Sequence, residues 1–226
     1  MSHRPVGTGP LACDSARVRV DAARPGAPAR GSRELAVWLA PAVGIALAQI
    51  AAHLVDFQVY DFHLRALNAN SDASVVAWLT PAGMALALGG ILTCIRFRAT
   101  ARARSGVVAA LLVGLLVVAS ARRGAFGGSL SLHRSTLMLA PALVVLLALL
   151  LREARQAEVT SRQLLRIGCA LLVGSYVLHV LGGSLADAGG EHSWPYQLGV
   201  ALKEGTEVAG WLIVGLGCCR AAMVDR

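Results

Sequence analysis

The chain has 226 residues, of which 56% are hydrophobic and only 15% are charged, and its mean hydropathy is +0.61. This composition argues against an ordinary soluble domain and indicates that lipid surrounds most of the chain. The formal net charge of +8 does not indicate a nucleic-acid partner, because the basic residues stand at the ends of apolar segments, where they orient a membrane protein.

The first 33 residues are rich in Pro, Gly, Ala and Arg and contain no long apolar run. Such a segment cannot bury enough apolar surface to fold, so we expect residues 1–33 to form a disordered basic cytoplasmic tail. The tail is too long for the n-region of a signal peptide, and no small-residue cleavage pattern follows it. We therefore expect the first apolar segment to act as an uncleaved signal anchor.

Six apolar segments follow and make up a predicted transmembrane domain over residues 34–220, with a short cytoplasmic tail at 221–226. Several of them exceed the roughly 17 uncharged residues that a helix needs to cross the hydrocarbon core. The sequence therefore predicts an all-α, polytopic integral membrane protein built as a six-transmembrane-helix bundle. The approximate helix ranges are 35–57, 74–95, 105–121, 135–151, 164–185 and 196–219.

Arginines are distributed unequally between the two sets of connections. In a six-span topology, 16 arginines fall on the side of the termini and 4 on the other side. Cytoplasmic connections carry the excess of basic residues, so this asymmetry predicts an N-in, C-in protein of the cell membrane. The lipid bilayer is the predicted partner, and the many small residues leave open a homo-oligomer or a larger membrane complex.

The first segment carries a polar stripe in its outer half. Gln49, His53, Asp56 and Tyr60 follow one another at steps of 4, 3 and 4, which places all of them on one face of an α-helix. On the fifth segment, Ser175 and His179 have the same i, i+4 relation.

The last segment carries three charged residues far from its ends. Glu207 lies roughly 18 Å along the predicted helix, which is near the middle of a membrane. Glu204 shares its face at i, i+3, and Lys203 can reach it at i, i+4. Two carboxylates and one ammonium leave one excess negative charge. Charges at this depth should face the interior of the bundle and find partners there.

These patterns predict an outward-opening polar site between the first, fifth and sixth helices. The alternative is structural, because polar side chains also hold membrane helices together, at about 0.6 kcal/mol per interhelical hydrogen bond. The candidate site residues are His53, Asp56, His179, Lys203, Glu204 and Glu207, with Gln49, Tyr60 and Ser175 in support.

Three functions are compatible with this site. The first is proton- or cation-coupled transport of a small solute, with a buried glutamate as the carrier and a histidine as a relay. The second is a membrane-embedded protein or enzyme that acts on a lipid-like substrate with a divalent metal or haem. Its candidate ligands are His53, His179, Glu204 and Glu207, with the two histidines as the haem ligands.

The third function is that of a structural subunit in a membrane complex. The sequence contains no GxSxG, Walker A, GxGxxG or HExxH motif, so it leaves undecided whether the protein is an enzyme.

Overall fold

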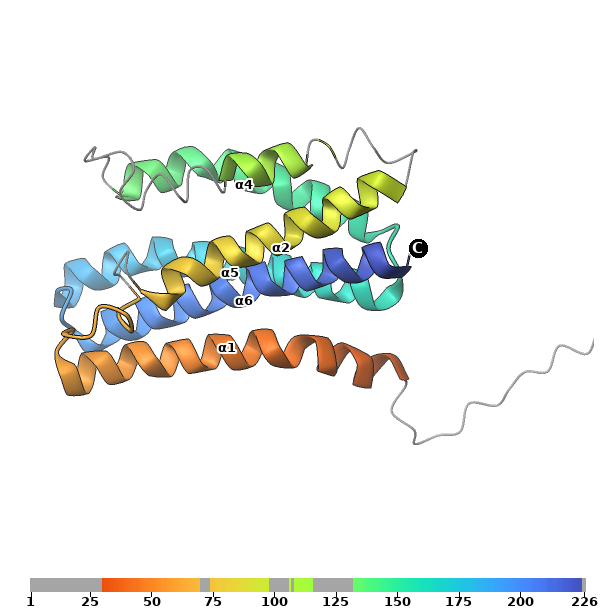
Figure 1. The fold of residues 1–226 in the computed structure, drawn as a ribbon. Helices are drawn as coiled ribbons and strands as arrows, with labels where there is room; N and C mark the ends of the chain where they lie inside the picture. The colour runs from red at the N-terminus through yellow and green to blue at the C-terminus, as the bar shows by residue number, and fades with distance from the viewer. Residues whose placement is uncertain (1–29, 70–73, 98–105, 107, 116–131, 225–226) are drawn as a thin grey trace, which may run out of the picture.

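The computed structural model describes residues 30–69, 74–97, 106, 108–115 and 132–224, and every regular element in these ranges is a helix (Figure 1). Residues 106 and 108–115 are helical and stand between α2 and α4 in the chain. The all-helical class predicted from the sequence is therefore confirmed. The other helices are α1 (Arg30–Tyr60), α2 (Val75–Phe97), α4 (Leu132–Ala154), α5 (Val159–Gly189) and α6 (Trp194–Val224).

These helices extend beyond the predicted apolar segments. α1 begins at Arg30, inside the predicted tail, and α6 continues to Val224, beyond the predicted 196–219. The apolar run marks only the part of a helix that would lie in lipid, whereas polar turns continue the backbone hydrogen bonds past it. The rest of the predicted tail, residues 1–29, lies outside the described residues.

Among the described residues, three helices are long and apolar enough to cross a membrane. They are Ser32–Tyr60 within α1, Val159–Gly182 within α5, and Trp194–Val224, which is all of α6. A shorter apolar helix, Ala77–Thr93, lies within α2. These helices are compatible with insertion into a membrane.

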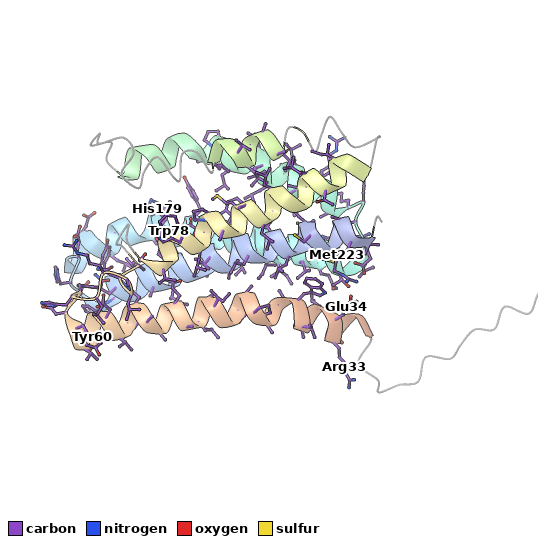
Figure 2. All side chains as sticks on the ribbon, in the orientation of Figure 1. Arg33, Glu34, Tyr60, Trp78, His179 and Met223 are labelled. Carbon is purple, nitrogen blue, oxygen red and sulfur yellow. The ribbon has the colours of Figure 1, made fainter. Side chains whose placement is uncertain are left out.

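The last helix is the centre of the fold. α6 packs against α5, α2 and α1, whereas α4 packs against α5. In Figure 1, α1 and α4 lie on opposite sides of the layer formed by α2, α5 and α6. We name the two ends after the orientation expected from the arginines: the end with Arg30 and Val224 is the inner end, and the end with the α1–α2 and α5–α6 connections is the outer end. Figure 2 shows Tyr60 at the outer end, and Glu34 and Met223 at the inner end.

The main apolar core joins one face of α6 to α2, the 108–115 helix, α4 and α5. Trp211, Val214 and Cys218 of α6 lie in this cluster with residues of α2, the 108–115 helix, α4 and α5. Leu112 and Leu146 are fully buried in it. The face of α6 that carries Trp211 is therefore covered by apolar side chains toward the inner end.

Glycines allow α6 to approach its neighbours closely. A Cβ atom at Gly90 of α2 would lie 2.7 Å from the backbone of Cys218 and Cys219. On α5, a Cβ atom at Gly168 would lie 2.9 Å from the backbone nitrogen of Val214. Backbone cannot move aside as a flexible side chain can, so these contacts require glycine.

We predict that Gly90→Ala destabilises the protein by ~1–3 kcal/mol, because the added methyl group would push α2 away from α6. The matched control is Gly89→Ala, since a Cβ atom at Gly89 meets nothing within 4 Å. Alanine is also the better helix former, so Gly89→Ala should be neutral or stabilising by up to about 1 kcal/mol. Unfolding in detergent micelles measures both, and equal effects would contradict the close approach.

Candidate functional site

His53 lies at the junction of α1, α6 and the α1–α2 connection, and it is fully buried. Its Nδ1 accepts a hydrogen bond from the backbone N–H of Ala69 at 3.0 Å. Its Nε2 lies 3.0 Å from Oε1 of Gln197 on α6. Because a backbone N–H can only donate, Nδ1 must be the acceptor and Nε2 the protonated nitrogen. His53 is therefore a neutral imidazole with both nitrogens bonded.

Gln197 extends this chain of hydrogen bonds to the α5–α6 turn. Its Nε2 donates to the carbonyl oxygen of Glu191 at 2.5 Å, which leaves Oε1 facing His53. Gln197 is itself buried. Nothing in the residue pattern of α6 marked this glutamine as a partner of α1, because the pairing joins helices that are 144 residues apart in the chain.

Asp56 holds the same connection one turn further along α1. It is fully buried, and its Oδ1 accepts a hydrogen bond from the backbone N–H of Leu64 at 3.0 Å. Its Oδ2 has no hydrogen-bond partner among the described residues. Together, His53 and Asp56 tie the 61–69 connection to the outer end of α1.

The backbone turns sharply where this connection begins. Asp61 and Phe62 both have positive φ angles, of 46° and 62°. A left-handed conformation costs a residue other than glycine roughly 1 kcal/mol or more. Ring contacts with Phe57, at 5.3 Å between centroids, and with His53, at 5.9 Å, hold Phe62 in this conformation.

The two remaining residues of the polar stripe on α1, Gln49 and Tyr60, differ in burial. Gln49 is buried, and neither atom of its amide group has a hydrogen-bond partner among the described residues. Tyr60, by contrast, is 45% exposed at the end of α1. The stripe is thus a buried polar row from Gln49 to Asp56, and Tyr60 lies outside it.

The charged residues of α6 form a triad. Nζ of Lys203 lies 2.5 Å from Oε1 of Glu204 and 3.0 Å from Oε2 of Glu207. Their side chains are 22%, 19% and 27% exposed, respectively. α6 has 31 residues, and Glu207 stands two residues before its midpoint, Ala209. One ammonium therefore serves two carboxylates halfway along the central helix.

A side chain from α5 contacts the backbone of this triad. The carbonyl oxygen of Lys203 accepts hydrogen bonds from Oγ of Ser175 at 3.1 Å and from Oγ1 of Thr206 at 2.9 Å. His179 follows Ser175 by one helical turn, is half-buried, and lies toward α2, near Trp78 in the view of Figure 2. The triad and the polar residues of α5 thus lie along the same pair of helices.

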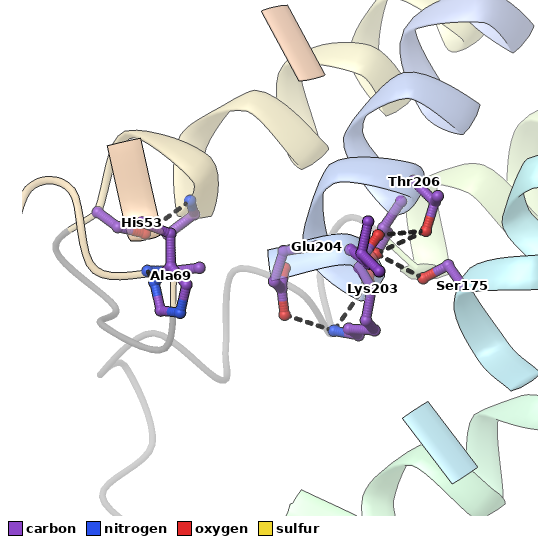
Figure 3. Close-up of polar contacts among 10 residues, drawn as sticks. His53, Ala69, Ser175, Lys203, Glu204 and Thr206 are labelled. Carbon is purple, nitrogen blue, oxygen red and sulfur yellow. Dashed lines mark hydrogen bonds and ion pairs between the residues drawn. The ribbon is translucent and has the colours of Figure 1, made fainter. Parts of the chain in front are cut away.

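The candidate residues therefore form two groups. His53, Asp56 and Gln197 gather around the 61–69 connection, whereas Lys203, Glu204 and Glu207 gather on α6 beside Ser175 (Figure 3). Lys203 follows Gln197 by six residues, which is about 9 Å along the helix. The described residues contain no group of three or more His, Cys, Asp or Glu that could hold a metal ion. With both nitrogens bonded, His53 also has no lone pair free for a metal or haem iron.

The inner end carries a third polar cluster, which the sequence did not predict. Arg220 of α6 forms ion pairs with Glu34 of α1 and with Glu158, whose Oε2 lies 3.4 Å from Nε of Arg220. Its guanidinium also lies 5.7 Å from the ring centroid of Trp38. The sequence identifies Arg220 only as one of the 16 arginines on the side of the termini. Its partners come from other helices, so no local spacing could identify them.

Glu158 is also the N-cap of α5. Its Oε2 accepts hydrogen bonds from the backbone N–H of Ser161 at 3.3 Å and from the hydroxyl of Ser161 at 3.4 Å. A carboxylate in this place satisfies free N–H groups and is favoured by the helix dipole. Arg220 thus joins the capped end of α5 to α1 and α6.

Comparison with protein-family models, with curated proteins and with solved structures finds no match to this chain.

We predict that Glu158 makes the stability of the protein depend on pH. Burial alone would raise the pKa of Glu158, but hydrogen bonds from Thr160 and Ser161 and the charge of Arg220 outweigh it and lower that pKa. A carboxyl group with a lowered pKa in the folded state stabilises that state above its unfolded pKa, and this contribution is lost as the pH falls through the folded pKa.

Thermal unfolding in detergent at neutral and acidic pH measures this effect. The wild-type protein should lose more stability on acidification than Glu158→Gln, since glutamine does not titrate. Other carboxyl groups affect both proteins equally, so only the difference between them reports on Glu158. Parallel losses in the two proteins would show that the cap does not depend on charge.

Proposed function

We propose that this chain is a six-span protein of the cell membrane, with both termini cytoplasmic, that couples the movement of a small solute to a proton or another cation. The observation that carries this proposal is the Lys203, Glu204 and Glu207 triad, in which two carboxylates share one ammonium halfway along the central helix. The arrangement of the helices supports the six-span topology, and the charge balance of the triad supports cation binding.

The arrangement of the helices supports an even number of spans. Arg220, near the end of α6, pairs with Glu34, near the start of α1, so both ends of the helical region lie together. α2 and α4 have 23 residues each, which is about 35 Å of helix and enough to cross the hydrocarbon core. The excess of arginines assigns the inner end to the cytoplasm.

The charge balance of the triad supports cation binding. Lys203 can neutralise only one of the two carboxylates, so the group retains one negative charge unless a proton or a metal cation joins it. A negative charge at this depth is costly in lipid, which favours uptake of a cation. Of the two carboxylates, that of Glu207 lies further from Nζ of Lys203 and is the more exposed.

The two ends of the molecule differ in a way that fits a state open to the outside. Toward the inner end, the apolar core and the Arg220 ion pairs close the bundle. Nearer the outer end, the side chains of the triad are 19–27% exposed. A cation could therefore reach the triad from outside, whereas its release to the cytoplasm requires the inner end to open. Alternating access in transporters has this asymmetry.

We predict that the double variant Glu204→Gln and Glu207→Gln abolishes cation movement, because it removes both carboxylates and leaves the shape of the side chains nearly unchanged. The full chain is reconstituted into lipid vesicles that contain a pH-sensitive dye, and proton entry is followed after a membrane potential is imposed. Wild-type vesicles should acidify faster than empty vesicles, and vesicles with the double variant should match the empty ones.

Glu191→Gln is the matched control, since Glu191 is an exposed glutamate of the α5–α6 turn. It should retain the wild-type rate. Circular dichroism and size-exclusion chromatography show whether each variant is folded before it is compared. Wild-type rates in a folded double variant would overturn the assignment of the triad.

A further inference from the structure

We propose that the 61–69 connection is a pH-operated lid, which is released from the outer end when His53 gains a proton. The inference is drawn from the hydrogen bonds around His53. It concerns a group of residues other than the triad.

The bonds of His53 leave one place for an added proton. Nε2 already carries a hydrogen, which it donates to Gln197. The proton must therefore bind to Nδ1, whose lone pair accepts the N–H of Ala69 at 3.0 Å. Two N–H groups cannot donate to each other, so protonation replaces this attraction with repulsion. The connection then loses its bond to His53, and the N–H of Ala69 turns to water.

The groups near His53 decide how readily its ring gains a proton. The buried position of the ring opposes the imidazolium, whereas the hydrogen bond to Gln197 of α6 and the carboxylate of Asp56 on α1 favour it. From α6, the neutral amide of Gln197 faces the ring. From the α5–α6 turn, Glu191 contributes its carbonyl oxygen to Gln197, and His192 contacts the ring of Phe62. From the connection, the backbone of Ala69 faces the ring.

The connection is strained, and two side chains of α1 bind its backbone in addition to the backbone hydrogen bonds from Phe62 to Asp56 and from Val75 to Ala66. Its first two residues, Asp61 and Phe62, have left-handed backbones. Apart from His53, the side chain that holds its backbone to α1 is Asp56, through the N–H of Leu64. An imidazolium would attract Oδ2 of Asp56, which has no hydrogen-bond partner in the described part of the chain, and would draw the carboxylate toward the ring. Protonation thus weakens both attachments, and relief of the strain favours release.

The lid covers the part of α6 that carries the triad. Ala69 is buried and lies in one apolar cluster with Val208. Val208 directly follows Glu207 and lies one turn after Glu204. Release of Ala69 would therefore uncover α6 beside the two carboxylates. If the proposed function holds, acid outside the cell widens the access that cations already have to the triad, but release of the lid can be measured without it.

Hydrogen exchange followed by mass spectrometry tests the lid on the full chain in lipid nanodiscs, at about pH 8 and about pH 5. After correction for the intrinsic pH dependence of exchange, protection of the peptide over 62–69 should fall about tenfold in acid, the factor expected for one lost hydrogen bond. In His53→Asn, the amide oxygen can still accept the N–H of Ala69 but does not titrate. In this variant, protection of the 62–69 peptide should be equal at both pH values.

His192→Asn separates the two histidines near the connection: the acid response should persist in this variant, because His192 is exposed and contacts the ring of Phe62 rather than the N–H of Ala69. A second variant does not depend on replacing His53. Gln197→Glu places a carboxylate beside Nε2 and should move the midpoint of release to higher pH by about one unit.

Constant protection in the wild-type protein would overturn the proposal, and so would an acid response that persists in folded His53→Asn. The proposal would also be overturned if the pH midpoint of lid release did not rise in Gln197→Glu. Cation flux does not enter these measurements, so failure of the lid and failure of the triad as a cation site are separate results.

Discussion

The close packing of α6 against α2 and α5 is the constraint on which the rest of the structure depends. Glycines at positions such as Gly90 and Gly168 bring helix backbones into contact. In lipid, the hydrophobic effect does not draw helices together, so close packing and hydrogen bonds must do so. Because α6 is surrounded by other helices, its charged residues can be sheltered from lipid. A triad of two glutamates and a lysine is tolerable at this depth only on such a helix.

Polar residues serve different purposes along the length of the molecule. At the inner end, Arg220 joins three helices through two carboxylates and an aromatic ring. At the outer end, buried His53 and Asp56 hold backbone N–H groups of a connection. Between them, the triad has more negative than positive charge. The inner group joins helices and the outer group binds a connection, whereas the triad carries a formal excess of one negative charge, which is why we assign cation binding to the triad and movement to the outer end.

The candidate residues on α1 illustrate how a functional pattern can have a structural cause. A histidine and an aspartate one turn apart on a transmembrane segment are typical of a proton path or a metal site. Here, each instead binds the backbone of the following connection, whose N–H groups at Leu64 and Ala69 would otherwise lose these partners. The same bonds make the connection sensitive to protonation, so the structural and regulatory roles of His53 have one origin.

The sequence by itself determined the helical class and the pairing of Lys203 with Glu207, because these depend on composition, periodicity and spacing within one helix. It did not predict the bond between His53 and Gln197 or the ion pairs of Arg220. It also grouped the residues of α1 and α6 into a single site, which the tertiary structure divides into two. Only the packing of distant helices decides such contacts, since a side chain on one helix meets its partner through the rotation and register of both.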